Sequence, residues 1–208
     1  MIQGLYSALS AIVAGDNRIS VTANNIANVN STSYKSQYSV LSELSKGGVK
    51  VISVNSDKSQ GYLIHTGRNL DLAINGNGYF KVYGENGENL TREGNFYLDK
   101  NGEIVNANGE RLTDGLNLNN NNDEISIDTK GNLLVNGEKV FKIDIFNDNN
   151  NPAPEDSYEI MSGFLEASNV DLAKEIVNNI VDLRYVQANT KTVKTTDEML
   201  GYILDIKS

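Results

Sequence analysis

The beginning of the chain contains the stretch that decides the fold, IQGLYSALSAIVAGDNRISVTANNIA, at positions 2–27. Apolar or small residues recur along it at alternating steps of three and four, which is the spacing of one face of an α-helix. That face consists of Leu5, Ala8, Ile12, Gly15, Ile19, Thr22 and Ile26. No proline interrupts the pattern, and residues 28–33 are rich in Asn and Ser, which favour caps and turns. The pattern predicts an amphipathic helix with a narrow seam.

A second helical pattern fills the other end of the chain, from residue 168 to residue 206. Ser168, followed three residues later by Asp171, resembles a capping box at the start of a helix. The seam of this helix consists of Ile176, Ile180, Leu183, Val186, Thr190, Val193, Leu200 and Leu204. A helix of this length reaches roughly 55 Å at about 1.5 Å per residue, too long to pack on a small domain alone. We therefore expect the two terminal helices to pair as a coiled-coil-like stalk.

The segment between the helical patterns, residues 70–161, has the pattern of β-structure. Apolar residues alternate with polar or small ones at Leu70, Leu72 and Ile74, and further strand-like runs follow. Asn-Gly pairs, which suit tight hairpin turns, occur six times, at 75–76, 77–78, 86–87, 101–102, 108–109 and 136–137. The segment is therefore predicted to be a compact, mostly antiparallel β-domain, with turns at Gly76, Gly78, Gly102 and Gly137.

These patterns predict an α+β protein with four consecutive segments. Residues 1–33 form an N-terminal assembly helix, and residues 34–69 form an extended linker with short strands. Residues 70–161 form the central β-domain, and residues 162–208 form a C-terminal assembly helix. The linker is polar and is broken by Gly47, Gly48 and Gly61.

Composition excludes several classes of function. The 208 residues carry a net charge of −9, and residues 70–161 alone hold 17 acidic and 7 basic residues, a net −10 that repels nucleic-acid backbones. The absence of cysteine excludes disulfides, thiolate metal sites and cysteine nucleophiles. No apolar run approaches the roughly 20 residues that span a bilayer. The first fifteen residues lack the basic start of a signal peptide, so we expect any export to proceed without cleavage of a signal.

The sequence gives little indication of catalytic or metal-binding residues. His65 is the single histidine, and we interpret it as a polar residue near a strand end. Asp99-Lys100-Asn101-Gly102 lacks the glycine spacing of a calcium loop and is better explained as a hairpin turn. Pairs of carboxylates in the β-domain leave open a peptidoglycan-acting enzyme or a glycan-binding module. We expect no catalytic residue, no metal site and no cofactor.

Four blocks of sequence resemble the flagellar rod and hook protein family. The first is Ala23-Asn24-Asn25-Ile26-Ala27-Asn28 followed by Ser33-Tyr34-Lys35, which is similar to the family's N-terminal signature. The second and third, 66–80 and 91–102, resemble its middle β-domain. The fourth, Gly163-Phe164-Leu165-Glu166-Ala167-Ser168-Asn169-Val170-Asp171-Leu172, resembles the start of its C-terminal helix. Residues 184–187 match the family pattern only loosely, which leaves the particular paralogue open.

The resemblance implies a non-enzymatic structural subunit of the bacterial flagellar basal-body rod. It implies polymerisation through the terminal helices into a hollow tube that spans the periplasm and transmits torque. The implied partners are copies of the chain, other axial rod and hook subunits and the flagellar export apparatus, with no nucleic acid and no membrane insertion. A hook or junction subunit of the same family is the alternative. The candidate assembly residues are Leu5, Ile12, Ile19, Ala23, Asn24, Asn25, Ile26, Asn28, Tyr34, Lys35, Ser168, Asn169, Val170, Asp171, Ile176, Ile180, Leu183, Val193 and Leu200.

Overall fold

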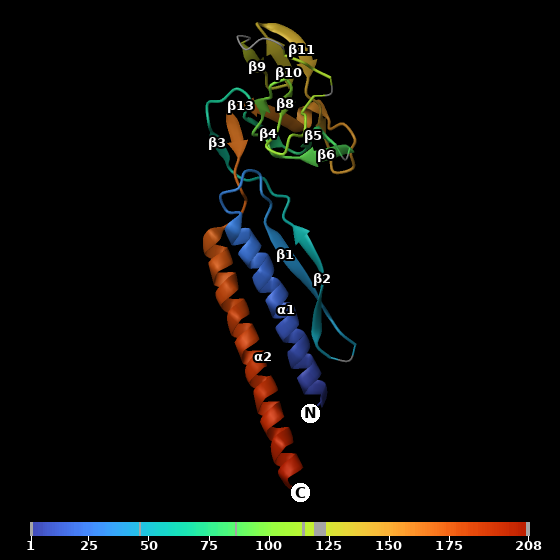
Figure 1. Ribbon diagram of the computed structural model, residues 1–208, viewed down its shortest axis with the longest axis vertical. Helices are drawn as coiled ribbons and strands as arrows, with labels where there is room; N and C mark the ends of the chain where they lie inside the picture. The colour runs from blue at the N-terminus through green and yellow to red at the C-terminus, as the bar shows by residue number, and fades with distance from the viewer. Residues whose placement is uncertain (1, 46, 86, 114, 119–123, 207–208) are drawn as a thin grey trace. The chain divides into compact units, whose positions relative to one another are not determined.

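The computed structural model describes residues 2–45, 47–85, 87–113, 115–118 and 124–206 (Figure 1). The chain divides into two compact units. The helical unit comprises the described residues of 1–29, 35–59 and 170–208, and the β-unit comprises those of 30–34 and 60–169. Helices at both ends of the chain and antiparallel strands between them confirm the predicted α+β class.

Two long helices and one hairpin build the helical unit. The elements are α1 (Ile2–Ala27), α2 (Leu172–Ile206), β1 (Gln37–Glu43) and β2 (Val49–Ser56). α1 and α2 lie side by side and run in opposite directions, and both strands of the hairpin also pack against α1 (Figure 1). The predicted helices are therefore present at both ends of the chain, with a hairpin beside the first of them.

The start of α2 differs from the predicted capping box. The helix begins at Leu172, and the Asp171 carboxylate accepts a hydrogen bond from the Lys174 amide at 3.1 Å. Asp171 is thus itself the N-cap, which is a residue type that favours this position. Ser168 is buried within the β-unit, so the assignment of the cap to Ser168 was wrong.

Residues 37–56, within the segment predicted as an extended linker, form an antiparallel hairpin. Its register pairs Gln37 with Ser56 and Glu43 with Val49, with an irregularity between Val40 and Leu41. Such a bulge bends a strand and increases its twist.

The β-unit contains twelve strands and one short 3₁₀ helix within the described residues. They are β3 (Leu63–His65), β4 (Leu72–Gly76), β5 (Tyr79–Gly84), β6 (Gly87–Thr91), β7 (Tyr97–Leu98), β8 (Ile104–Val105), β9 (Ile125–Ile127), β10 (Asn132–Val135), β11 (Glu138–Lys142), β12 (Ile145–Phe146), η1 (Glu155–Ser157), β13 (Tyr158–Ser162) and β14 (Phe164–Glu166). The described strands pair in the orders β11-β10-β9, β12-β5-β6, β13-β4, β14-β3 and β7-β8. All these pairings are antiparallel. The pairs β13-β4 and β14-β3 join the end of the β-unit to its beginning.

Short polar side chains close the turns between these strands. The Asp99 carboxylate accepts hydrogen bonds from the amides of Asn101 and Glu103, both at 2.8 Å. The same arrangement, with one side-chain oxygen accepting from the amides two and four residues later, recurs at Asn106, Asp128 and Asn147. This use of the Asp99 side chain is that of a hairpin turn.

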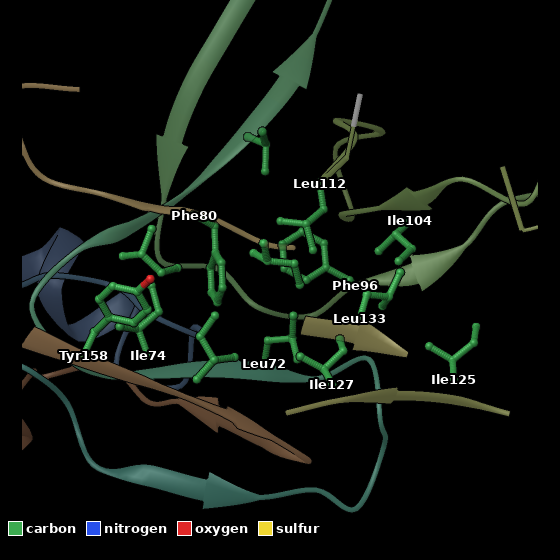
Figure 2. Close-up of a cluster of buried hydrophobic side chains, with 14 of the residues drawn as sticks. Leu72, Ile74, Phe80, Phe96, Ile104, Leu112, Ile125, Ile127, Leu133 and Tyr158 are labelled. Atoms are coloured by element: carbon green, nitrogen blue, oxygen red, sulfur yellow. The ribbon is translucent and has the colours of Figure 1, made fainter. Parts of the chain in front are cut away.

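The core of the β-unit is a cluster of buried apolar side chains (Figure 2). Its centre includes Leu72 and Ile74 from β4, Phe80 from β5, and Phe96, each at most 1% exposed. The rings of Phe80 and Phe96 meet edge to face, with centroids 5.7 Å apart. Along β5 the buried residues alternate with partly exposed ones, which is the two-residue period of a strand with one buried face.

Candidate assembly surfaces

The contact between α1 and α2 is built from small residues on the α1 side. Ala8 and Ala11 are buried and lie near Tyr185 of α2. A Cβ atom added at Gly15 would lie 2.5 Å from Val186 Cγ2, so the two helices approach too closely at this point for a larger residue. Gly15, a member of the predicted seam, is therefore a site of close helix packing.

The α2 side of the same contact contains polar residues beside Val186. Glu175, Asp182 and Thr196 are buried. Arg18 Nη2 of α1 lies 2.6 Å from Asp182 Oδ1, and the Arg18 side chain remains about one-third exposed. Burial raises the pKa of Asp182, and the positive charge of Arg18 opposes that rise. The pair fixes the antiparallel register of the two helices at one charged contact.

An apolar stripe on α2 is left largely uncovered. Its members are 43–58% exposed: Leu172, Ile176, Val177, Ile180, Val181 and Leu183. Ile176, Ile180 and Leu183 belong to the predicted seam, but of that seam Val186 lies against Gly15 of α1, near the buried Asp182. Monomeric proteins rarely expose a large contiguous apolar patch without an interaction to explain it. The stripe is therefore a candidate contact surface.

Asn25 holds the hairpin against the end of α1. Its amide nitrogen donates to the Gln37 carbonyl and its amide oxygen accepts from the Gln37 N–H, both at 2.8 Å. The side chain is only 1% exposed. A primary amide carries the donor and the acceptor that this pair of bonds requires, so Asn25 satisfies both backbone groups of the first residue of β1.

The tip of the hairpin meets the other half of α1. The Val49 amide donates to Ser10 Oγ at 3.2 Å, and a Cβ added at Gly48 would lie 2.3 Å from that oxygen. Beside this contact lies a groove of about 1160 Å³ between α1 and the hairpin tip. We call it the α1–hairpin groove, and its lining includes Tyr6, Leu9, Val13, Leu44, Lys50 and Val51.

A buried ion pair connects three separate parts of the β-unit. Arg92 Nε lies 2.7 Å from Glu166 Oε2, and both side chains are at most 7% exposed. The remaining Arg92 nitrogens donate to the carbonyls of Ile74, Gly76 and Gly78 at 2.9–3.0 Å. Such a planar fork of donors matches several acceptors at once. The role of this network in the fold is to join the β4–β5 turn to β14.

Sequence reasoning did not identify Arg92, Glu166, Arg18 or Asp182. Arg92 and Glu166 did lie inside the blocks that resemble the rod and hook family, and that position was the available signal. Arg18 and Asp182 carried no such signal because they are charged residues on helices, which usually face solvent.

The predicted assembly residues differ in their surroundings. Two are buried: Asn25 and Ser168. Six are exposed: Ala23, Asn24, Asp171, Ile176, Ile180 and Leu183. The others are half-buried: Leu5, Ile12, Ile19, Ile26, Asn28, Tyr34, Lys35, Asn169, Val170, Val193 and Leu200. The Lys35 ammonium donates to the Ser59 carbonyl at 2.7 Å, and the Asn169 amide donates to the Tyr34 carbonyl at 3.2 Å. The four turn glycines, Gly76, Gly78, Gly102 and Gly137, all have positive φ.

Neither a metal centre nor a membrane span emerges from the described part of the chain. No group of three or more His, Asp or Glu side chains within it is arranged to hold an ion. No helix within the same residues has the length and hydropathy to cross a bilayer. The ring of His65 lies edge-on to Phe164, with centroids 4.9 Å apart.

Three family models match successive parts of the chain. Residues 5–35 match a flagella basal body rod protein model. Residues 73–135 match the D1 domain of flagellar hook proteins FlgE/F/G, and residues 161–206 match the C-terminal part of flagellar basal body rod FlgEFG proteins. The three matches follow the order of α1, the β-unit and α2.

Relatives that align along the whole chain are also flagellar basal-body rod proteins. The chain is 29% identical over 266 aligned positions to the flagellar basal-body rod protein FlgG of Bacillus subtilis, with 100% of each chain covered. It is 28% identical over 235 positions to the flagellar basal-body rod protein FlgF of Rhizobium meliloti, with 99% of this chain and 98% of the relative covered. These similarities extend across both the helical unit and the β-unit.

Proposed function

This chain belongs to the flagellar basal-body rod protein family as a structural subunit and not an enzyme, and we propose that it polymerises through its terminal helices into a hollow axial tube that transmits torque. In this proposal residues 1–33 and 162–208 are the assembly segments, and the terminal helices form a coiled-coil-like stalk. The hairpin of 37–56, which packs on α1, belongs to the assembly part of the subunit in this proposal.

The observation that carries the proposal is the uncovered apolar stripe on α2. Ile176, Ile180 and Leu183 are 45–54% exposed although α1 already packs along the helix. Burying such side chains against neighbouring subunits is favourable by about 25 cal/mol per Å² of apolar surface. A subunit in a tube has neighbours on several sides, so this stripe has a function there that it lacks in a monomer.

Partners and location follow from the same assignment. The chain is a flagellar component, and its family assembles with other axial flagellar proteins. We further propose export through the flagellar secretion channel and a final position in the part of the axle that spans the periplasm. Ordering the backbone of a residue costs about 1–2 kcal/mol, and only the burial of many side chains at once offsets such a cost, so we expect subunits to add cooperatively at the growing tip.

A single charge on the stripe tests this function. Ile180→Asp should leave expression, the fold of the subunit and export intact, because the side chain is 54% exposed in the subunit alone. Assembly should fail, since the same carboxylate would be buried without a partner in the tube. Ile180→Leu, which keeps an apolar side chain of the same size at the same position, is the matched control. Cells with Ile180→Asp as the only copy should lack complete hooks and swim poorly. Normal hooks and motility would refute assembly through this stripe.

A further inference from the structure

The α1–hairpin groove is an apolar surface that the subunit does not fill by itself. Tyr6, Leu9 and Val13, which lie on one face of α1 and line the groove, are 67%, 52% and 56% exposed. The opposite wall is the hairpin tip, including Leu44 and Val51. Three exposed residues at steps of three and four present a ridge of the kind against which a second helix packs.

The end of α2 is an apolar surface of matching type. Arg18 faces Asp182 and Gly15 faces Val186, so the antiparallel register places the start of α1 opposite about residue 199. The last two turns of α2 therefore have no described α1 residue opposite them, and Figure 1 shows α2 continuing past the start of α1. Met199, Tyr202 and Ile203 are 44%, 71% and 51% exposed there.

The charges around the two surfaces are complementary. Lys50, an exposed residue, lies at the wall of the groove. The end of α2 carries Asp197, Glu198 and Asp205 around its apolar residues. Opposite charges at the rim of a contact favour one partner and one orientation over others.

A subunit cannot place its own α2 end into its own groove. α2 packs along the face of α1 that contains Ala8, Ala11 and Gly15. The groove lies on a different face, marked by Leu9 and Val13, and α2 is one continuous helix that does not turn toward it. The occupant must therefore come from another molecule.

We propose that the α1–hairpin groove of one subunit receives the end of α2, from Asp197 to Ile206, of a second copy of this chain, with Lys50 facing Glu198. This inference rests on the proposed function and specifies one of its contacts. Because the groove and the α2 end are two different surfaces of one molecule, the contact repeats from subunit to subunit and does not close on itself, which is the geometry of a helical filament.

Disulfide cross-linking between copies tests the contact, because the chain contains no cysteine of its own. Cells would carry the double variant Leu9→Cys with Ile203→Cys as their only copy, and isolated basal bodies would be oxidised and run on a non-reducing gel. We expect a ladder of dimers and larger species from the double variant and monomers from each single variant. Val140→Cys with Ile203→Cys is the matched control, since Val140 is 46% exposed but lies in the β-unit, and it should give no ladder.

The outcomes separate this contact from the wider proposal. Basal bodies that contain the double variant only as monomer would overturn the contact and leave the proposed function standing. A cross-link from Leu9→Cys alone to a different axial protein would also overturn it. Absence of the unaltered chain from basal bodies would overturn both.

A charge exchange provides a test without cysteines. Lys50→Glu should reduce motility, and adding Glu198→Lys to the same chain should restore it, because every copy then presents the reversed pair to its neighbour. Failure of the second change to restore motility would count against the pairing of Lys50 with Glu198.

Discussion

Three asparagines of the motif at residues 24–28 have three different roles. Asn25 is buried and clamps Gln37, whereas Asn24 is exposed. The Asn24 carbonyl accepts two hydrogen bonds from Asn28, from its side-chain amide at 2.9 Å and from its backbone N–H at 3.2 Å. The order of residues in the motif therefore has a physical reason at the level of single hydrogen bonds.

The first prediction compares two of these asparagines. Asn25→Asp removes the donor to the Gln37 carbonyl and buries a charge beside that oxygen, so it should destabilise the helical unit by about 1–3 kcal/mol or more. Asn24→Asp makes the same chemical change at an exposed position and should have little effect. Hydrogen exchange of the Gln37 amide and denaturant unfolding would measure both. Equal behaviour of the two variants would contradict the clamp.

Gly102 and Gly137 support a second prediction, because they share a backbone conformation but not their surroundings. Their φ values are +79° and +85°, so alanine is strained at either position by about 1–2 kcal/mol. At Gly102 an added Cβ would also lie 2.3 Å from the Leu118 carbonyl oxygen, whereas at Gly137 nothing lies within 4 Å. Gly102→Ala should therefore lower the melting temperature of the β-unit more than Gly137→Ala. Thermal unfolding followed by the tyrosine signal would measure both melting temperatures. A larger loss from Gly137→Ala than from Gly102→Ala would contradict the turn geometry described here.

At the scale of elements, the contact between α1 and α2 includes a charged pair, Arg18 and Asp182. Burial raises the pKa of the Asp182 carboxyl above its ordinary 3.8. A group whose folded-state pKa is raised holds its proton more tightly in the folded state. Its contribution to stability is therefore lost as pH rises from about 3.8 through the folded pKa.

Removing each partner of this contact gives the third prediction. Asp182→Asn should make the free energy of unfolding less dependent on pH, because the side chain no longer ionises. Arg18→Met leaves a buried carboxylate without its cation and should cost about 1–3 kcal/mol at neutral pH, more than Asp182→Asn, which leaves an arginine that is partly solvated. Denaturant unfolding followed by the helical signal across pH 3–7 would compare them. A larger loss from Asp182→Asn would contradict this account.

The elements also show what could be predicted from the sequence. The helical spacing of residues 2–27 and 168–206 and the Asn-Gly turns predicted both helices and an antiparallel β-domain, because these signals are local. Val186 of the predicted seam does lie against α1, but the burial of Asp182 on the same helix could not be predicted, since a charged residue resembles a solvent-facing one until Arg18 is brought beside it. The buried network of Arg92 and Glu166 joins residues 74 positions apart, and no local pattern reports such a pair.

At the scale of the whole molecule, the two units differ in charge and in the surface they present. The acidic residues are concentrated in 70–161, whereas the exposed apolar residues of the helical unit gather on α2, on α1 and on the hairpin. An acidic β-unit and apolar helical surfaces suit a subunit that assembles through its ends.

The central claim is that the terminal helices build the wall of the axial tube, and cryo-microscopy of purified basal bodies tests it most directly. We expect many copies of this chain in a helical array, with α1 and α2 of neighbouring copies packed together around a central channel and the Ile176–Leu183 stripe buried between subunits. A map in which the β-units form the wall while the helices project free, or in which the chain is absent from the rod, would contradict the claim.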